Sequence, residues 1–301
     1  MPHASPDDVP RPKIGDRNFV GDMDPTSLLA SPSRGLITAP LTDGLRGPGG
    51  GAALGVLVTL ADVVASDPAL AACSPDWTAT QDLSLHGAGW LTEGPIVVET
   101  RLVRVGKKVV VVAAEVYDGR GDGDIEHVAE RIEAARAGET EGVPALAAAG
   151  LVTFARLPRA AAVDVGDHDP AAWVGKVRRR SVAHEVEGSL HDRMGVTVVD
   201  PEAGVLELHR TSYVVNSIGT INGGAQAILL QAAAEGMRPG LAARDMEVHY
   251  LSQVKAGPAR TRGRVVRDGA DHSVVSLELV DAGADDQVLA LATVTLQRPP
   301  G

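Results

Sequence analysis

Cysteine, aromatic residues and long apolar runs are scarce in this chain of 301 residues. Cys73 is the only cysteine, so no disulfide can form within the chain and a reducing compartment, the cytoplasm, is expected. Phe, Trp and Tyr together make up 3% of the residues, so the core must be built from Val, Leu, Ile and Ala. No uncharged apolar run reaches the ~18 residues of a membrane span, and residues 1–16 lack the apolar segment of a secretory signal.

Several catalytic and binding signatures are also missing. The sequence has neither the G-x-S-x-G turn of serine hydrolases nor a phosphate-binding P-loop. The nine histidines form no H-x-H or H-x-x-x-H pair, so with one cysteine we expect no metal site. The formal net charge of −11 argues against nucleic acid as a partner, because proteins that bind it present a basic face.

The chain does contain two glycine-led helices, each followed by a series of strands. Three glycines precede an apolar run over residues 52–66, and its helical spacing predicts a mostly buried helix with one charge, Asp62. Residues 222–224, Asn-Gly-Gly, open a second apolar helix. Alternation of apolar and polar residues then predicts strands. These strands cover residues 77–85, 94–106, 107–119 and 145–157 in the first half, and residues 245–254, 257–269, 271–281 and 287–297 in the second.

The two halves repeat one plan. Residues 81–118 align with residues 244–281; in both stretches a Gly-Pro begins the second strand and an Asp ends the third. We therefore expect an α+β protein of two tandem domains, each a long central helix wrapped by an antiparallel β-sheet. The expected divisions are a polar N-terminal arm at 1–34, domain 1 at 35–157 with an inserted exposed helix at about 124–139, a linker at 158–180 and domain 2 at 181–298.

The Asn-Gly-Gly helix start is the first candidate for chemistry. A buried helix that begins on glycines presents unpaired N–H groups and the positive end of its dipole. Such a start can hold a phosphate or a developing oxyanion. A core helix with a glycine turn would show the same pattern, so both interpretations stay open at this point.

The halves resemble hotdog domains, and the second helix start is similar to that of the PaaI-type acyl-CoA thioesterases. That family opens its helix with N-x-x-G-T-x-H-G-G. Here residues 216–224 read NSIGTINGG, with Asn222 where the family has His. The family places an acid eight residues after the first glycine of the pair, and this sequence has Gln231 there. The resemblance covers residues 35–157 and 181–298.

The first half shows the reverse pattern. Asp62 falls at the acid position of the family, and Thr80, 18 residues later, falls where the family has a Ser or Thr on the next strand. The glycine-pair positions of this half are Leu54 and Gly55. In the second half the position equivalent to Thr80 is Ala243. The losses in the two halves are therefore complementary.

Family members build their active sites between two hotdog units, so the resemblance implies two composite sites within this chain. One, around Gln231, has lost its acid. The other joins the second helix start to the acid of the first half, through Asn216, Gly223, Gly224, Asp62 and Thr80.

The resemblance also implies roles for these residues. A glycine N–H would bind the thioester oxygen, and Asp62 would act as general base on water or as nucleophile. Asn216 would orient water or the carbonyl, and Thr80 would hold water or the Asp62 carboxylate. Each could instead be structural: Asp62 a solvated helix residue, Thr80 an ordinary strand residue and Asn216 a turn cap. Asn222 is expected to cap the helix.

The implied function is hydrolysis of an acyl-CoA, or of a carrier-bound acyl thioester, to the free acid. No cofactor is expected apart from the coenzyme A of the substrate, and a homodimer of double-hotdog chains is the expected assembly. Two alternatives stay open. One is a non-catalytic acyl-CoA or acyl-lipid binding protein on the same fold, and the other is an accessory enzyme of a lipid or polyketide pathway.

Overall fold

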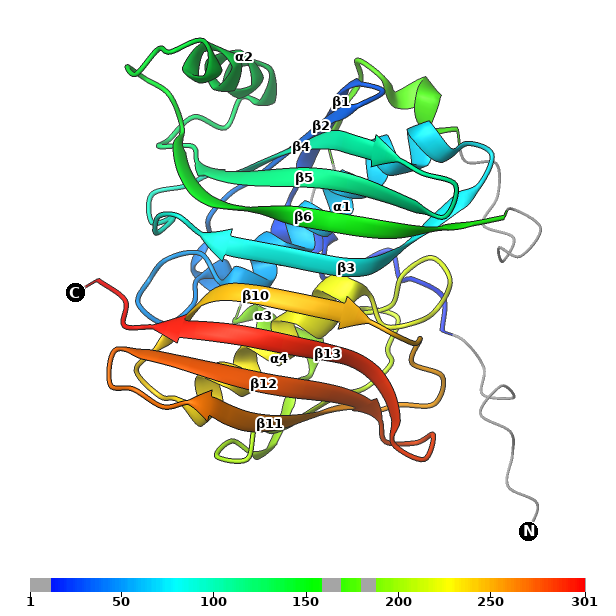
Figure 1. The fold of residues 1–301 in the computed structure, drawn as a ribbon, viewed down its shortest axis with the longest axis vertical. Helices are drawn as coiled ribbons and strands as arrows, with labels where there is room; N and C mark the ends of the chain where they lie inside the picture. The colour runs from blue at the N-terminus through cyan, green and yellow to red at the C-terminus, as the bar shows by residue number, and fades with distance from the viewer. Residues whose placement is uncertain (1–11, 159–168, 180–187, 301) are drawn as a thin grey trace.

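A single antiparallel sheet dominates the computed structural model, which describes residues 12–158, 169–179 and 188–300 (Figure 1). In these residues the sheet has 13 strands in the order β7-β1-β2-β4-β5-β6-β3-β10-β13-β12-β11-β9-β8. The strands are β1 (Thr26–Ser31), β2 (Arg34–Ala39), β3 (Trp77–Gly87), β4 (Ile96–Val105), β5 (Val109–Asp118), β6 (Ala145–Leu157), β7 (Val177–Arg179), β8 (Thr197–Asp200), β9 (Val205–Leu208), β10 (Ala242–Tyr250), β11 (Ala259–Arg267), β12 (His272–Asp281) and β13 (Gln287–Gln297).

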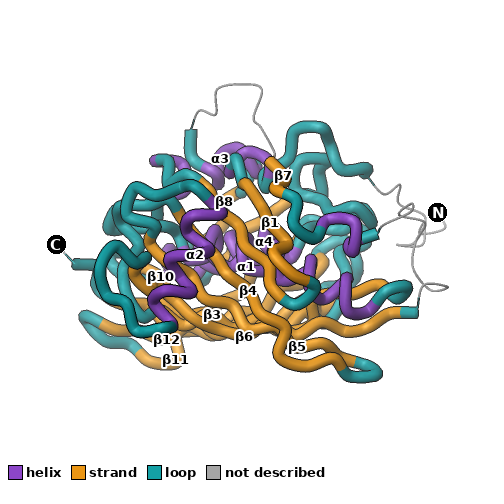
Figure 2. The backbone as a smooth tube through the Cα atoms, turned by 90° about the horizontal axis from the view of Figure 1, so that it is seen from above, coloured by secondary structure: helices purple, strands orange, loops and turns teal. Residues whose placement is uncertain are grey.

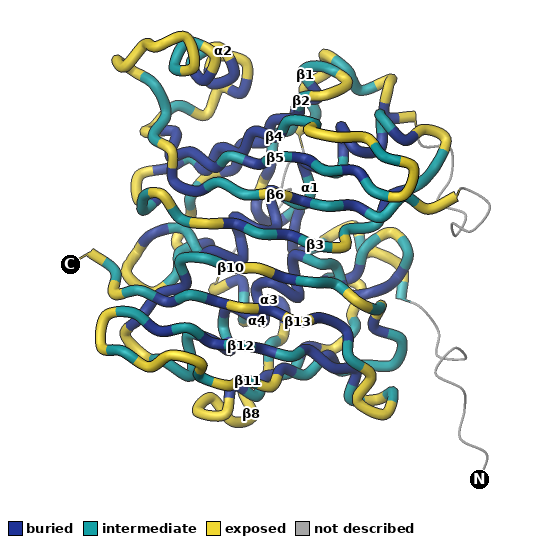
Figure 3. Tube along the Cα trace, viewed as in Figure 1, coloured by how far each residue is buried: buried dark blue, intermediate teal, exposed yellow. Residues whose placement is uncertain are grey.

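Four α-helices accompany the sheet in the described part of the chain: α1 (Leu54–Cys73), α2 (Ile125–Arg136), α3 (Leu190–Met194) and α4 (Gly223–Met237). The long helices α1 and α4 lie on the same face of the sheet (Figure 2), and most of their residues are buried (Figure 3). Each half therefore has the expected central helix wrapped by an antiparallel sheet. Among the described helices, α1 alone is long and apolar enough to cross a membrane, yet 72% of its most apolar stretch is buried inside the fold.

The two central helices meet in a two-fold manner. Gly224 of α4 lies against Thr59 of α1, so closely that a Cβ on Gly224 would come 2.5 Å from the Thr59 Oγ1. Gly55 of α1 lies against Ile228 of α4 in the same way, and its Cβ would come 2.7 Å from the Ile228 Cα. In the aligned helices Gly55 corresponds to Gly224, and Thr59 corresponds to Ile228. Each helix therefore uses a glycine in its first turn to approach the other helix closely.

The sheet is continuous because β3 of the first half pairs with β10 of the second. Both strands carry an Asp and, four residues later, a His, and the register places each Asp opposite the His of the other strand. Asp82 Oδ1 lies 2.6 Å from His249 Nδ1, and Asp245 Oδ1 lies 3.9 Å from His86 Nδ1. The repeated Asp and His thus mark the two-fold relation between the halves.

A second contact is repeated in the two halves. Asp118, at the end of β5, accepts hydrogen bonds from the N–H groups of residues 92–94. Asp281, at the end of β12, accepts hydrogen bonds from the N–H groups of residues 255–257. Each carboxylate therefore fixes the loop that leads into the second long strand of its half, as the repeated Asp of the two sequences suggests.

The N-terminal segment and the linker contribute more to the sheet than expected. Strand β1 and the buried side chains of Phe19, Met23 and Leu29 all lie within residues 1–34, which the sequence pattern assigned to a polar arm. The linker contributes β7, which pairs with β1 at one sheet edge. Short strands joined by irregular segments carry too few alternating residues to predict from sequence. Residues 159–168 and 180 of the expected linker, residues 181–187 at the beginning of domain 2 and residues 1–11 lie outside the described residues.

The charged sequence of α2 suggested an exposed helix, but one face of α2 is buried. Its apolar residues Ile125, Val128, Ala129 and Ile132 pack on the outer face of β1, β2, β4 and β5, and form a second apolar cluster with Leu28, Leu36, Val97 and Tyr117. A chain segment inserted between β5 and β6 thereby covers part of the sheet surface that faces away from α1. The sequence showed the helix but not the face on which it docks.

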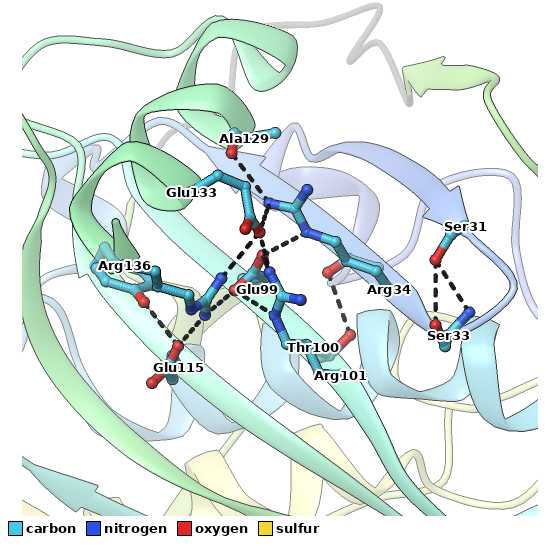
Figure 4. Close-up of polar contacts among 12 residues, drawn as sticks. Ser31, Ser33, Arg34, Glu99, Thr100, Arg101, Glu115, Ala129, Glu133 and Arg136 are labelled. Atoms are coloured by element: carbon cyan, nitrogen blue, oxygen red, sulfur yellow. Dashed lines mark hydrogen bonds and ion pairs between the residues drawn. The ribbon is translucent and has the colours of Figure 1, made fainter. Parts of the chain in front are cut away.

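An ion-pair network holds α2 in place beside this cluster (Figure 4). Glu99 on β4 has a side chain that is 1% exposed and binds Arg34 of β2 at 2.5 Å, Arg101 of β4 at 3.1 Å and Arg136 of α2. Burial would raise the pKa of Glu99, but hydrogen bonds from Arg136 and Arg34 hold the pKa below its usual value. Glu133 of α2 contacts the same three arginines, yet its side chain is 48% exposed.

Replacement of Glu99 should destabilise the protein far more than replacement of Glu133. Glu99→Gln leaves three arginines facing a neutral buried group, and we expect a loss of about 3–5 kcal/mol in the free energy of unfolding. Glu133→Gln changes an exposed partner of the same arginines and should cost under about 1 kcal/mol. Urea unfolding of both variants measures these losses, and equal losses would show that burial of Glu99 does not set the strength of the network.

Candidate active site

A cavity of about 890 Å³ lies between the two halves. Its wall includes α1, β3 and the N-terminal segment from the first half, and the start of α4 with the loops before α4 and after β10 from the second half. Of the predicted site residues, it is lined by Asp62, Thr80, Asn216 and Gly223. One cavity thus brings together residues that are more than 130 positions apart in the sequence.

Asp62 and Thr80 form a hydrogen-bonded pair in this wall. The Thr80 Oγ1 donates to the Asp62 Oδ1 at 2.6 Å, from β3 to α1. Burial raises the pKa of Asp62 from its usual 3.8 to about 6, and the hydrogen bond from Thr80 opposes that rise. At neutral pH the carboxylate is therefore ionised, and it is a stronger base than an ordinary aspartate.

The start of α4 stands next to this pair. Gly224 contacts Thr59, which precedes Asp62 by nearly one turn of α1, so the first turn of α4 approaches the same part of α1. Asn222 caps the helix as expected, because its Oδ1 accepts the Gly224 N–H at 2.8 Å. The Gly224 N–H is therefore occupied, whereas the N–H of Gly223 has no acceptor among the residues that the structure describes.

Tyr250, at the end of β10, is a site residue that the sequence analysis missed. Its hydroxyl donates to the Gly223 carbonyl at 2.9 Å, and its ring lies against the Gly223 Cα. Burial, and then the negative charge of Asp62, hold the pKa of Tyr250 well above its usual value, so the phenol stays protonated beside the carboxylate. The aligned repeats offered a signal, because Tyr250 corresponds to Gly87 in the first half.

Asn216 closes the turn that precedes α4. Its Oδ1 accepts hydrogen bonds from the N–H groups of Ile218 at 3.1 Å and Thr220 at 3.3 Å. Its backbone N–H also donates to the Thr220 carbonyl at 2.9 Å. Asn216 therefore has a structural role as a turn cap, in addition to its place in the cavity wall.

A second junction, related to this one by the two-fold repeat, lies where the start of α1 meets the middle of α4. The side-chain amide of Gln231 closes it. Gln231 Oε1 accepts the Gly55 N–H at 2.6 Å, across the interface between the halves. Gln231 Nε2 donates to Glu235 Oε1 at 2.9 Å, which also accepts the Ala243 N–H at 2.9 Å. Burial raises the pKa of Glu235 to about 7. The Gln231 amide thus occupies the N–H of Gly55, the residue that corresponds to Gly224 of α4.

Arg244 fills the place that corresponds to Tyr250 at this junction. It lies directly over Gly87, where a Cβ would come 2.5 Å from the Arg244 Cζ. Its Nη1 donates to the Gly89 carbonyl at 2.6 Å, and its guanidinium lies 4.8 Å from the ring centroid of Trp90. The second junction is therefore packed with side chains of the protein.

The comparisons with known proteins agree with this architecture. Residues 213–297 match the family described as the Acyl-CoA thioesterase N-terminal domain, which is a family of thioester hydrolases. No sequence among the curated proteins matches the chain. The fold is that of the hotdog thioesterases, whereas the finer resemblance to the PaaI type stays a prediction.

Three solved structures illustrate the likeness over the whole chain. A Lactobacillus plantarum protein assigned as an oleoyl thioesterase has a TM-score of 0.57 and 11% identity, over 91% of this chain and 98% of that one. The tesB protein of Mycobacterium avium subs. paratuberculosis has a TM-score of 0.55 and 9% identity, over 94% and 98%. An acyl-ACP thioesterase from Bacteroides thetaiotaomicron has a TM-score of 0.52 and 12% identity, over 88% and 98%. At these identities the likeness establishes the fold alone.

The raised pKa of Asp62 makes the stability of the protein depend on pH. Because the folded-state pKa of about 6 exceeds the usual 3.8, the contribution of Asp62 is fully present below pH ~4 and is lost as the pH rises through ~6. Asp62→Asn removes this loss. We expect its stability relative to the wild type to improve by up to about 3 kcal/mol between pH 4 and pH 8, measured by urea unfolding.

The raised pKa of Glu235 affects the stability of the variant and of the wild type in the same way. The difference between their free energies of unfolding therefore reports on Asp62 alone. A difference that stays constant from pH 4 to pH 8 would show that Asp62 is not held in an environment that disfavours its charge.

Proposed function

Because the chain has the hotdog fold and its second half matches the acyl-CoA thioesterase domain, we propose that it hydrolyses an acyl-CoA, or a carrier-bound acyl thioester, to the free acid at one composite site. The observation that carries this proposal is the single cavity that holds the Asp62–Thr80 pair of one half and the start of α4 of the other. The catalytic assignments are Asp62, Thr80, Asn216, Gly223 and Gly224.

The thioester carbonyl would bind at the start of α4. The Gly223 N–H is the better of the two glycine donors for its oxygen, because Asn222 already accepts the Gly224 N–H. Gly224 instead lets the helix approach Thr59 closely. Tyr250 holds the Gly223 carbonyl, which belongs to the next peptide group, and so restrains the backbone of Gly223 beside the donor. A fixed donor aimed at the developing oxyanion stabilises the transition state by about 3–4 kcal/mol.

Asp62 would supply the base. With a pKa of about 6 it takes a proton from water as the water oxygen bonds to the carbonyl carbon. The carbon–sulfur bond then breaks, the electron pair leaves on sulfur, and the proton passes to the thiolate. Direct attack by the carboxylate, followed by hydrolysis of the anhydride, uses the same geometry. Thr80 orients the carboxylate in either case.

We also propose that the enzyme acts in the cytoplasm, as the single buried thiol of Cys73 suggests, and without a cofactor beyond the coenzyme A of its substrate. Association of two chains into a homodimer follows from the resemblance to hotdog proteins and is part of the proposal. The division into domains at 35–157 and 181–298 also belongs to it.

Replacement of Asp62 should abolish turnover. In a thiol-release assay with short, medium, long and aryl CoA esters, Asp62→Asn is expected to lower kcat by about 10²–10⁴-fold, the usual contribution of a positioned base. Glu235→Gln is the matched control, since Glu235 is a buried carboxylate with a raised pKa at the other junction, and it should leave kcat within about threefold. An unchanged rate in Asp62→Asn would eliminate this site. A wild type that binds the esters without turnover would favour the non-catalytic acyl-CoA binding protein.

Thr80→Val gives an independent signature through the pH profile. The Thr80 hydrogen bond lowers the pKa of Asp62, so its removal raises that pKa further. The acidic limb of kcat/KM, near pH 6 in the wild type, should therefore move to higher pH as kcat falls. A limb that stays in place, or moves to lower pH, contradicts the assignment of Asp62 as the titrating base.

A further inference from the structure

Gln226 is a buried residue of the α4 first turn with an unused hydrogen-bond acceptor. Its side chain amide Nε2 donates to the Ile221 carbonyl at 3.0 Å. Its Oε1 is buried and has no partner among the residues that the structure describes. The residue as a whole is 4% exposed, and it lines the same cavity as Asp62 and Gly223.

The polar side chains around Gln226 are occupied by the backbone. Asn216 Oδ1 accepts two N–H groups of its own turn, and Asn222 Oδ1 accepts the Gly224 N–H. Thr220 Oγ1 accepts the Val254 N–H at 3.0 Å and donates to the Val254 carbonyl at 3.4 Å. The oxygen atoms of these side chains are therefore committed to the backbone that frames the cavity, whereas Gln226 Oε1 is not.

An unpaired buried acceptor is costly. Leaving such a group without a partner costs about 1–3 kcal/mol, so native structures keep few of them. A hydrophobic residue at this position would avoid the cost, because the surrounding helix is made of Ala, Leu and Ile. Because Gln226 lines the cavity, a small turn of its amide toward a bound ligand with a donor group would recover the cost.

We propose that Gln226 Oε1 accepts a hydrogen bond from an N–H or O–H group of the bound acyl thioester, so that the site selects substrates by this donor. The inference rests on the proposed function and refines its substrate class. Gly223 and Gln226 are three residues apart and lie on one face of α4, about 5 Å from each other. A thioester oxygen at Gly223 therefore places the donor a few bonds from the thioester carbon.

Two parts of a substrate carry a donor at that separation. One is the amide N–H of the pantetheine arm, two methylene groups beyond the sulfur. The other is a hydroxyl on the acyl chain at the third carbon. Both are hydrogen-bond donors to the same oxygen, and substrate pairs that differ in one atom distinguish them.

The first pair compares the N-acetylcysteamine thioester of a substrate acyl group with the analogue in which oxygen replaces the amide N–H. The second compares a saturated acyl-CoA with its 3-hydroxy counterpart. If the pantetheine arm is the source, the wild type should prefer the amide of the first pair by about tenfold in kcat/KM. If the acyl chain is the source, it should prefer the hydroxyacyl-CoA of the second pair by a similar factor.

Gln226→Met should bring the kcat/KM ratio of the pair that the wild type discriminates close to one. The change removes the acceptor and keeps the length and the apolar part of the side chain. The ratio between the two substrates cancels any general loss of activity in the variant. Gln81→Met, the same change at an exposed glutamine of the cavity wall, should alter neither ratio. A wild type that discriminates within neither pair, or a preference that survives Gln226→Met, overturns the proposal.

Should Gln226→Met fail to fold, a wild type that discriminates within neither pair still overturns the proposal. Failure of the proposed function is separable, because calorimetric binding of the corresponding 2-oxoalkyl thioethers, which cannot be hydrolysed, reports the same preference without turnover. If the protein discriminates in binding but hydrolyses no ester, Gln226 remains a ligand contact and the proposed thioesterase activity is refuted.

Discussion

The antiparallel pairing of β3 with β10, with α1 packed on α4 behind it, is the constraint on which the rest of the molecule depends. It joins the two halves into one sheet and brings the start of each central helix onto the middle of the other. An acid on one helix can therefore meet only the helix start of the opposite half. The two-fold relation produces two such junctions, where Gly224 packs on Thr59 and Gly55 packs on Ile228, respectively.

The two junctions differ because a cavity lies at one of them, whereas protein side chains fill the other. At one of them Asp62 and Thr80 face a cavity beside Gly223, whose N–H has no acceptor in the described residues. At the other, Gln231 supplies an acceptor for the N–H of Gly55, which corresponds to Gly224, and Arg244 covers the place that corresponds to Tyr250. The second junction can contribute stability through these contacts, whereas the first keeps a carboxylate in a setting that disfavours its charge. Under the proposed function, one junction would thus contribute stability and the other activity.

Periodicity and the internal repeat were sufficient to predict the two central helices and the long strands, whereas the Asp62–Thr80 contact followed from the resemblance to the PaaI-type thioesterases. Helical spacing found α1 and α4, alternation found the long strands, and the aligned repeats placed Thr80 and Ala243 at equivalent positions. In the structure both lie beside the irregularity in β3 and β10, respectively. Asn222 as the helix cap also followed from its residue type, because capping is a local interaction.

The features that sequence did not predict depend on contacts between distant segments. β1 and β7 are short and pair at a sheet edge, so their alternation is too brief to recognise. The docking face of α2 is set by Glu99, whose arginine partners come from three elements. Tyr250 and Gln226 belong to the site only because the end of β10 and the first turn of α4 lie beside Asp62, and neither residue type signals this by itself.

The number of ligand molecules bound per chain tests the central claim most directly, since one of two symmetry-related junctions is held to survive as a site. Isothermal titration calorimetry with a non-hydrolysable 2-oxoalkyl-CoA thioether measures this number on the intact protein. The account predicts one molecule per chain, with the same number in Glu235→Gln, which alters only the closed junction. Two molecules per chain, or none, would contradict it.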